Sequence, residues 1–202
     1  STLIMSISQI SETLFILAIP FFLKRFGIKQ VMLFSMVAWV LRFGLFAYGN
    51  PGDGLWMIIV SCIVYGMAFD FFNISGSLFV ETSTDSKIRS SAQGLFMMMT
   101  NGFGAIFGSI TSGYIIEKYF TDKYYNLNEF LTKFNLTIDD KWVVSLLKDK
   151  IVTNNVLNKP IGIIQWEPVW LTFAIYALVI TVAFALFFKH KHNPEAVEDI
   201  KH

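Results

Sequence analysis

The sequence predicts an all-α membrane protein that crosses the bilayer several times. Its 202 residues are 54% apolar and 15% charged, whereas an ordinary soluble domain carries about 25% charged residues. Five apolar stretches hold almost none of that charge, because their only charged residues are Glu12, Arg42 and Asp70. Each stretch is close to the roughly 20 residues that a helix needs to cross a bilayer. In chain order they are 1–23, 31–48, 54–80, 90–116 and 168–188.

Charges in the short connections predict which way each span runs. Lysine and arginine near the ends of spans favour the cytoplasmic side. The connections after the first, third and fifth spans carry them, and the Asn50–Gly54 turn after the second carries none. The predicted organisation is therefore four spans in 1–116, an extracytoplasmic segment 117–167, a last span 168–188 and a cytoplasmic tail 189–202. Two amphipathic patterns in 117–167 predict small helices there.

We expect the chain to be the C-terminal part of a longer membrane protein. The first predicted span begins at Ser1 without an initiator methionine, and its start lacks the basic region of a secretory signal. An odd number of spans with the C-terminus inside also places the N-terminus outside. The expected partners are therefore the lipid bilayer and preceding helices of the same protein.

Buried polar groups on four of the spans are predicted to lie at similar depth. With a rise of about 1.5 Å per residue, each lies about 16–20 Å from the cytoplasmic charge that ends its span, within a hydrocarbon layer about 30 Å thick. A shared layer near the midplane is where secondary transporters bind their cargo. The groups are Glu12, Arg42, Asp70 and Asn101.

The third span carries the pattern most suggestive of a binding face. Tyr65 and Phe69 are one helical turn apart, and Asp70 follows directly. Aromatic rings beside a carboxyl group suit a flat organic ligand with polar edges. The first span adds Gln9 and Glu12, which are three residues apart and share a face.

Each of these residues also has a purely structural interpretation. Asp70 or Glu12 can pair with Arg42 and hold the helices together. Tyr65 and Phe69 can be ordinary packing residues. Gln9 and Asn101 can form hydrogen bonds to neighbouring helices, which contribute well under about 2 kcal/mol each.

Motifs typical of enzymes and of cofactor or metal binding are absent from the sequence. It contains no phosphate-binding loop, no zinc-protease motif and no serine-hydrolase elbow. A formal net charge of +1 without a basic patch argues against a nucleic-acid partner, and the single cysteine, Cys62, argues against a disulfide scaffold. We therefore expect no catalytic residues, no cofactor and no metal ion.

Several stretches resemble bacterial nucleoside permeases of the nucleoside:proton symporter family, within the major facilitator superfamily. The longest is YGMAFDFFNISG at Tyr65–Gly76, and the first is SQISETLFI at Ser8–Ile16. The others are Ile19–Leu23, Ala38–Phe43, Ser91–Gly94 and Met98–Gly104. The resemblance implies a major facilitator superfamily helix bundle, of which these spans are the last five of twelve, in the bacterial inner membrane.

The resemblance also implies an activity and the residues that serve it. It implies import of nucleosides by proton symport, with substrate contacts at Gln9, Glu12, Tyr65, Phe69 and Asp70. Acids inside a membrane often relay protons, so Asp70, or otherwise Glu12, is expected to carry the coupled proton. Two alternatives stay open: a related carrier of another small polar solute such as a sugar, and a membrane subunit without transport activity.

Overall fold

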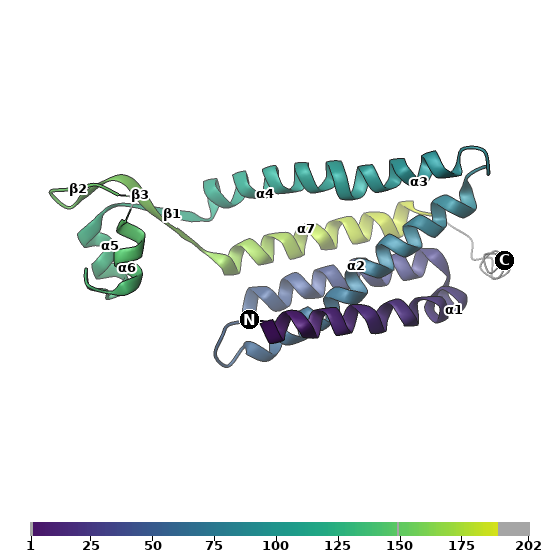
Figure 1. Ribbon diagram of the computed structural model, residues 1–202, viewed down its shortest axis with the longest axis horizontal. Coiled ribbons are helices and arrows are strands. Elements are labelled where there is room, and N and C mark those ends of the chain that lie inside the picture. Colours follow the sequence, from purple (N-terminus) through teal and green to yellow (C-terminus); the bar gives the residue numbers. More distant parts are fainter. Residues whose placement is uncertain (1, 149, 190–202) are drawn as a thin grey trace. The chain divides into compact units, whose positions relative to one another are not determined.

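A computed structural model describes residues 2–148 and 150–189 and shows a mostly helical chain (Figure 1). The chain divides into two compact units. The first comprises Ser1–Ser109 with Glu167–His202, and the second comprises Ile110–Trp166. The predicted cytoplasmic tail, except Lys189, lies outside the described residues.

Helix α1 (Thr2–Tyr48) consists of two helical halves separated at Gly27. Gly27 has φ 78° and ψ 168°, a backbone conformation that residues with a side chain rarely adopt. The chain reverses direction there, so that the second half returns beside the first (Figure 1). This break falls within the basic stretch that was predicted to separate the first two spans.

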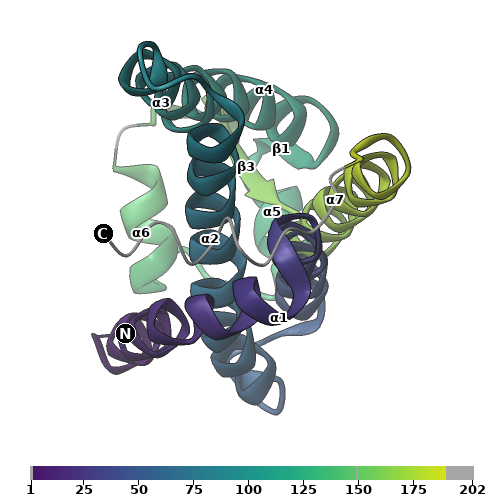
Figure 2. The same ribbon diagram turned by 90° about the vertical axis from the view of Figure 1, so that its right-hand side faces the viewer.

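Helix α2 (Leu55–Ser83) packs across both halves of α1 (Figure 1, Figure 2). The turn before it is fixed by the Asn50 side chain, whose Oδ1 accepts hydrogen bonds from the backbone N–H groups of Gly52 and Gly54 at 2.9 and 3.1 Å. The apolar core of the first unit forms where the three segments meet. Its buried members are Ile19, Leu23, Ile28, Val31, Met32 and Phe71.

The predicted span 90–116 is divided into three pieces. These are α3 (Arg89–Met97), the π-helical turn η1 (Met98–Phe103) and α4 (Gly104–Tyr119). In η1 the backbone N–H of Gly104 donates to the carbonyl of Met99, five residues earlier. None of the residues in these three elements is buried by the described part of the chain.

Helix α7 (Trp166–Phe187) is apolar along its length and exposes many of its side chains. The ammonium group of Lys29 donates a hydrogen bond of 3.1 Å to the carbonyl of Ala185 near the end of α7. Within the described ranges 2–148 and 150–189, three helical stretches are long and apolar enough to cross a membrane: Ser8–Tyr48, Leu55–Ser83 and Trp166–Phe187. The first of these contains the reversal at Gly27.

The second unit contains a β-sheet that the all-α prediction missed. Strands β1 (Thr121–Asn126), β3 (Val156–Ile164) and β2 (Val152–Thr153) lie in that order and pair antiparallel. Two short helices, α5 (Leu127–Phe134) and α6 (Lys141–Leu147), coincide with the amphipathic patterns. The sheet escaped prediction because its long pairing joins residues far apart in sequence, such as Thr121 and Ile164.

The second unit has an apolar core of its own. The helices and the sheet bury Tyr124, Leu127, Phe130, Val143, Leu157 and Ile161 together. Asn154 and Asn155 form the tight turn between β2 and β3 with φ values of 50° and 64°. Asparagine tolerates this left-handed conformation better than most residues, so these two side chains suit the turn.

Candidate functional site

The two acids of the predicted site are brought together where the first half of α1 crosses α2. Ser11 Oγ donates a hydrogen bond of 2.6 Å to the carbonyl of Ile63. A side chain on Gly66 would place its Cβ 2.7 Å from Glu12 Cα, so the two backbones touch at this point. Asp70 follows Gly66 by one helical turn. The crossing therefore places Glu12 beside the turn of α2 that carries Asp70.

The carboxyl group of Asp70 is buried and has an oxygen without a hydrogen-bond partner among the described residues. The side chain is 6% exposed, and the oxygen is Oδ2. Glu12 is half-buried and lies within electrostatic range of Asp70. A buried acceptor without a hydrogen-bond partner costs free energy. Binding of a proton, or of a hydrogen-bond donor from a ligand, would remove that cost at this oxygen.

Arg42 does not pair with either acid. Among residues 2–148 and 150–189, no ion pair joins Arg42 to Glu12 or to Asp70. Its Nη1 instead donates a hydrogen bond of 3.4 Å to the carbonyl of Ser61. The structural alternative in which Arg42 neutralises the acids is therefore not the arrangement observed.

Tyr65 and Phe69 form an aromatic shelf on α2. Their ring centroids are 5.8 Å apart and the planes differ by 26°, which is a stacked arrangement. Phe69 is 37% exposed, so part of its ring is open to a ligand. Trp39, on the second half of α1, meets the Tyr65 ring edge-on at 6.0 Å.

Three further polar residues of these helices lie in different settings. Gln9 is exposed one turn before Glu12 on the first half of α1. Asn73 donates its side-chain amide to the carbonyl of Phe69 in its own helix. Asn101 reaches the sulfur of Met97, also within its own segment, at 3.4 Å. The structure therefore brings Glu12, Tyr65, Phe69 and Asp70 to one region, with Gln9 near its edge.

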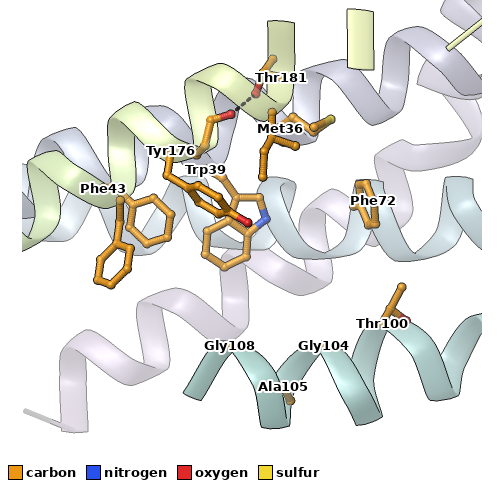
Figure 3. A pocket seen from close by; sticks show the side chains of 13 residues that line it. Met36, Trp39, Phe43, Phe72, Thr100, Gly104, Ala105, Gly108, Tyr176 and Thr181 are labelled. Carbon is orange, nitrogen blue, oxygen red and sulfur yellow. Dashed lines mark hydrogen bonds between the residues drawn. The ribbon is translucent and has the colours of Figure 1, made fainter. Parts of the chain in front are cut away.

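An apolar cavity of about 630 Å³ is lined by residues of α1, α2, η1, α4 and α7 (Figure 3). None of the five predicted site residues lines it. Its wall is almost entirely apolar, and Thr181 donates its hydroxyl to the carbonyl of Ala177 within α7. Lining residues include Trp39 and Phe43 of α1, Phe72 of α2, Gly104 and Gly108 of α4, and Tyr176 of α7.

Comparisons with known proteins show which family the chain belongs to. The family model described as nucleoside H+ symporter matches residues 1–193. The chain is 48% identical over 205 residues to the nucleoside permease NupG of Escherichia coli. It is 46% identical over 198 residues to the xanthosine permease of the same organism. The chain belongs to the nucleoside H+ symporter family.

The chain matches only part of the length of these relatives. The alignments cover 100% of this chain and 40% of NupG, and 98% of this chain and 38% of the xanthosine permease. A crystal structure of the nucleoside transporter NupG superposes with a TM-score of 0.68 at 48% identity, over 94% of this chain and 38% of that one. The fold is thus that of a transporter of the major facilitator type, and the chain spans about two fifths of the relatives' length.

Sequence reasoning missed the aromatic surroundings of Arg42 in this chain. The guanidinium carbon lies 4.2 Å from the ring centroid of Tyr65, 5.0 Å from that of Phe46 and 5.7 Å from that of Trp39. A signal existed, because Trp39, Arg42 and Phe46 are three and four residues apart and share a face of the helix. The contact with Tyr65, however, depends on how α1 and α2 align, which the sequence does not state.

Proposed function

We propose that the complete protein imports nucleosides across the bacterial inner membrane by proton symport. The chain supplies the last five of twelve transmembrane helices in this proposal. Residues 1–116 form the first four of them, 117–167 lie outside the cytoplasm, and 168–188 form the last. The proposal is supported by membership of the nucleoside H+ symporter family over residues 1–193.

The observation that carries the proposal is the meeting of two acids and an aromatic shelf at one helix crossing. A nucleoside has a flat base and a polar ribose. The base stacks on Phe69 and Tyr65, since base–aromatic stacking is favourable for any base. Glu12, Asp70 and Gln9 accept hydrogen bonds from the ribose hydroxyls or the base edge, and the Gln9 amide and a protonated acid can also donate to them. Each group of the cargo thus has a chemical counterpart on α1 or α2.

The acids also supply a route to proton coupling. Asp70 Oδ2 is buried without a hydrogen-bond partner among the described residues, and no cation pairs with Asp70 or Glu12 there. Two carboxylates this close repel one another when both are charged. Protonation of Asp70, with Glu12 as the second acid, removes that repulsion. The charge of the site therefore depends on whether Asp70 is protonated. Protonation then changes which conformation α1 and α2 favour.

The direct test is transport by the full-length protein reconstituted in liposomes. An imposed gradient, acidic outside, is expected to drive accumulation of radiolabelled uridine above its external concentration. A panel of unlabelled nucleosides is expected to compete, and a matched panel of sugars is not. Competition by sugars alone would favour a sugar carrier, and failure to move any solute would favour a subunit without transport activity.

A further inference from the structure

The side chain of Arg42 is held at two points on one turn of α2. Its Nη1 donates to the carbonyl of Ser61 at 3.4 Å, and its guanidinium carbon lies 4.2 Å from the centroid of the Tyr65 ring. The Ser61 hydroxyl in turn donates to the Arg42 carbonyl at 3.5 Å. A charge within a predicted membrane span is rare and costly, and such residues usually serve function.

The contacts of Arg42 continue into the aromatic shelf. Tyr65 is contacted by the guanidinium of Arg42, by the edge of Trp39 and by the stacked ring of Phe69. A guanidinium close to a ring is attracted by the ring's electrons, most strongly where water is excluded. Arg42 therefore contacts the same ring on which Phe69 stacks.

We propose that Arg42 is a positioning residue that orders the aromatic shelf for stacking of the nucleoside base. The inference rests on the proposed function, because it assigns the shelf to that cargo. It differs from the ion-pair interpretation of Arg42, since the cation acts on Tyr65 and leaves both acids without a paired cation among the described residues. Arg42 contacts no cargo itself and acts through Tyr65.

The first measurement is uridine affinity by calorimetry on the purified full-length carrier. Arg42→Met keeps an unbranched, flexible side chain and removes the guanidinium with its charge, and we expect affinity about tenfold weaker. Arg42→Lys keeps the charge without the flat guanidinium, and its uridine affinity is expected to lie between those of the parent and Arg42→Met. Arg25→Met is the matched control, because it removes a guanidinium 5.6 Å from the Phe26 ring, outside the site. It is expected to bind as the parent does.

A double-mutant cycle separates positioning from general support of the fold. In a Tyr65→Leu background the ring on which Arg42 acts is gone, so adding Arg42→Met is expected to weaken uridine binding no further. Independent, additive losses would overturn the proposal, since they would show that Arg42 acts elsewhere. Unchanged affinity in Arg42→Met would overturn it as well.

A second readout needs no ligand and so distinguishes failure of this inference from failure of the proposed function. With 3-fluorotyrosine placed at position 65, the parent and Arg25→Met are expected to give one narrow ¹⁹F resonance. Arg42→Met is expected to broaden or split it; an unchanged line would overturn the positioning role even in a carrier that binds no uridine. If Arg42→Met does not fold, the same comparison is made with Arg42→Lys.

Discussion

Replacing Gly66 by alanine adds a methyl group where the first half of α1 crosses α2. The new Cβ would lie 2.7 Å from Glu12 Cα and 2.8 Å from Glu12 N, whereas unbonded carbon atoms rest about 3.5–4.0 Å apart. The helices must therefore separate by about 1 Å. Overpacking of this kind costs about 1–3 kcal/mol, and the separation also stretches the nearby hydrogen bond from Ser11 to the Ile63 carbonyl.

The assay is thermal unfolding of the purified full-length carrier, followed by uridine uptake in liposomes. Gly66→Ala is expected to lower the Tm and to slow uptake, because Glu12 moves away from Asp70. The matched control is Gly44→Ala on the second half of α1, where nothing lies within 4 Å of the added Cβ. That variant is expected to be as stable as the parent or slightly more stable, since alanine has less freedom to lose on folding. A Gly66→Ala carrier with the stability and uptake rate of Gly44→Ala would refute the close crossing.

Two further predictions concern the shelf and the second unit. Phe69→Ala is expected to weaken uridine binding by about 1–3 kcal/mol through lost base stacking, while the protein stays in the membrane; unaltered affinity in a binding assay would reject stacking on this ring. In the second unit, Lys123 Nζ lies 2.9 Å from Glu117 Oε1, and this hydrogen-bonded cation lowers the pKa of Glu117. The stabilisation from that pair is present at pH values above the ordinary pKa of glutamate. It is lost as the pH falls through the lowered pKa of Glu117. Lys123→Met is expected to raise the pKa of Glu117 toward its ordinary value in a ¹³C NMR titration of the labelled carboxyl group, and an unmoved midpoint would contradict the pair.

The parts of the fold that follow from composition and spacing were accessible from the sequence. Long apolar stretches predict helices because the bilayer leaves backbone groups no other partner. The first reversal also carries a local signal, since Gly27 lies in a basic stretch and adopts a φ that favours glycine. Glu12 and Asp70 stood out because charges in such stretches are rare.

The missed features depend on pairings between distant segments. The contact of Arg42 with Tyr65 requires the alignment of α1 with α2, and two helices of the same composition can pack in several registers. Strand β3 pairs with β1 across an intervening stretch that includes both short helices, and nothing local indicates that partner. The π-helical turn at Met98–Phe103 adds a residue to a helical turn without a distinctive sequence pattern.

Proton flux during uridine uptake tests the role of the two acids most directly. The full-length carrier and its Asp70→Asn variant are compared in liposomes that contain a pH-sensitive dye. Uridine entry through the parent is expected to acidify the lumen. The variant, which keeps the shape of the side chain but cannot ionise, is expected to lose accumulation driven by the pH gradient. Parent-like acidification and accumulation in the variant would show that the coupled proton travels by a route that does not need Asp70.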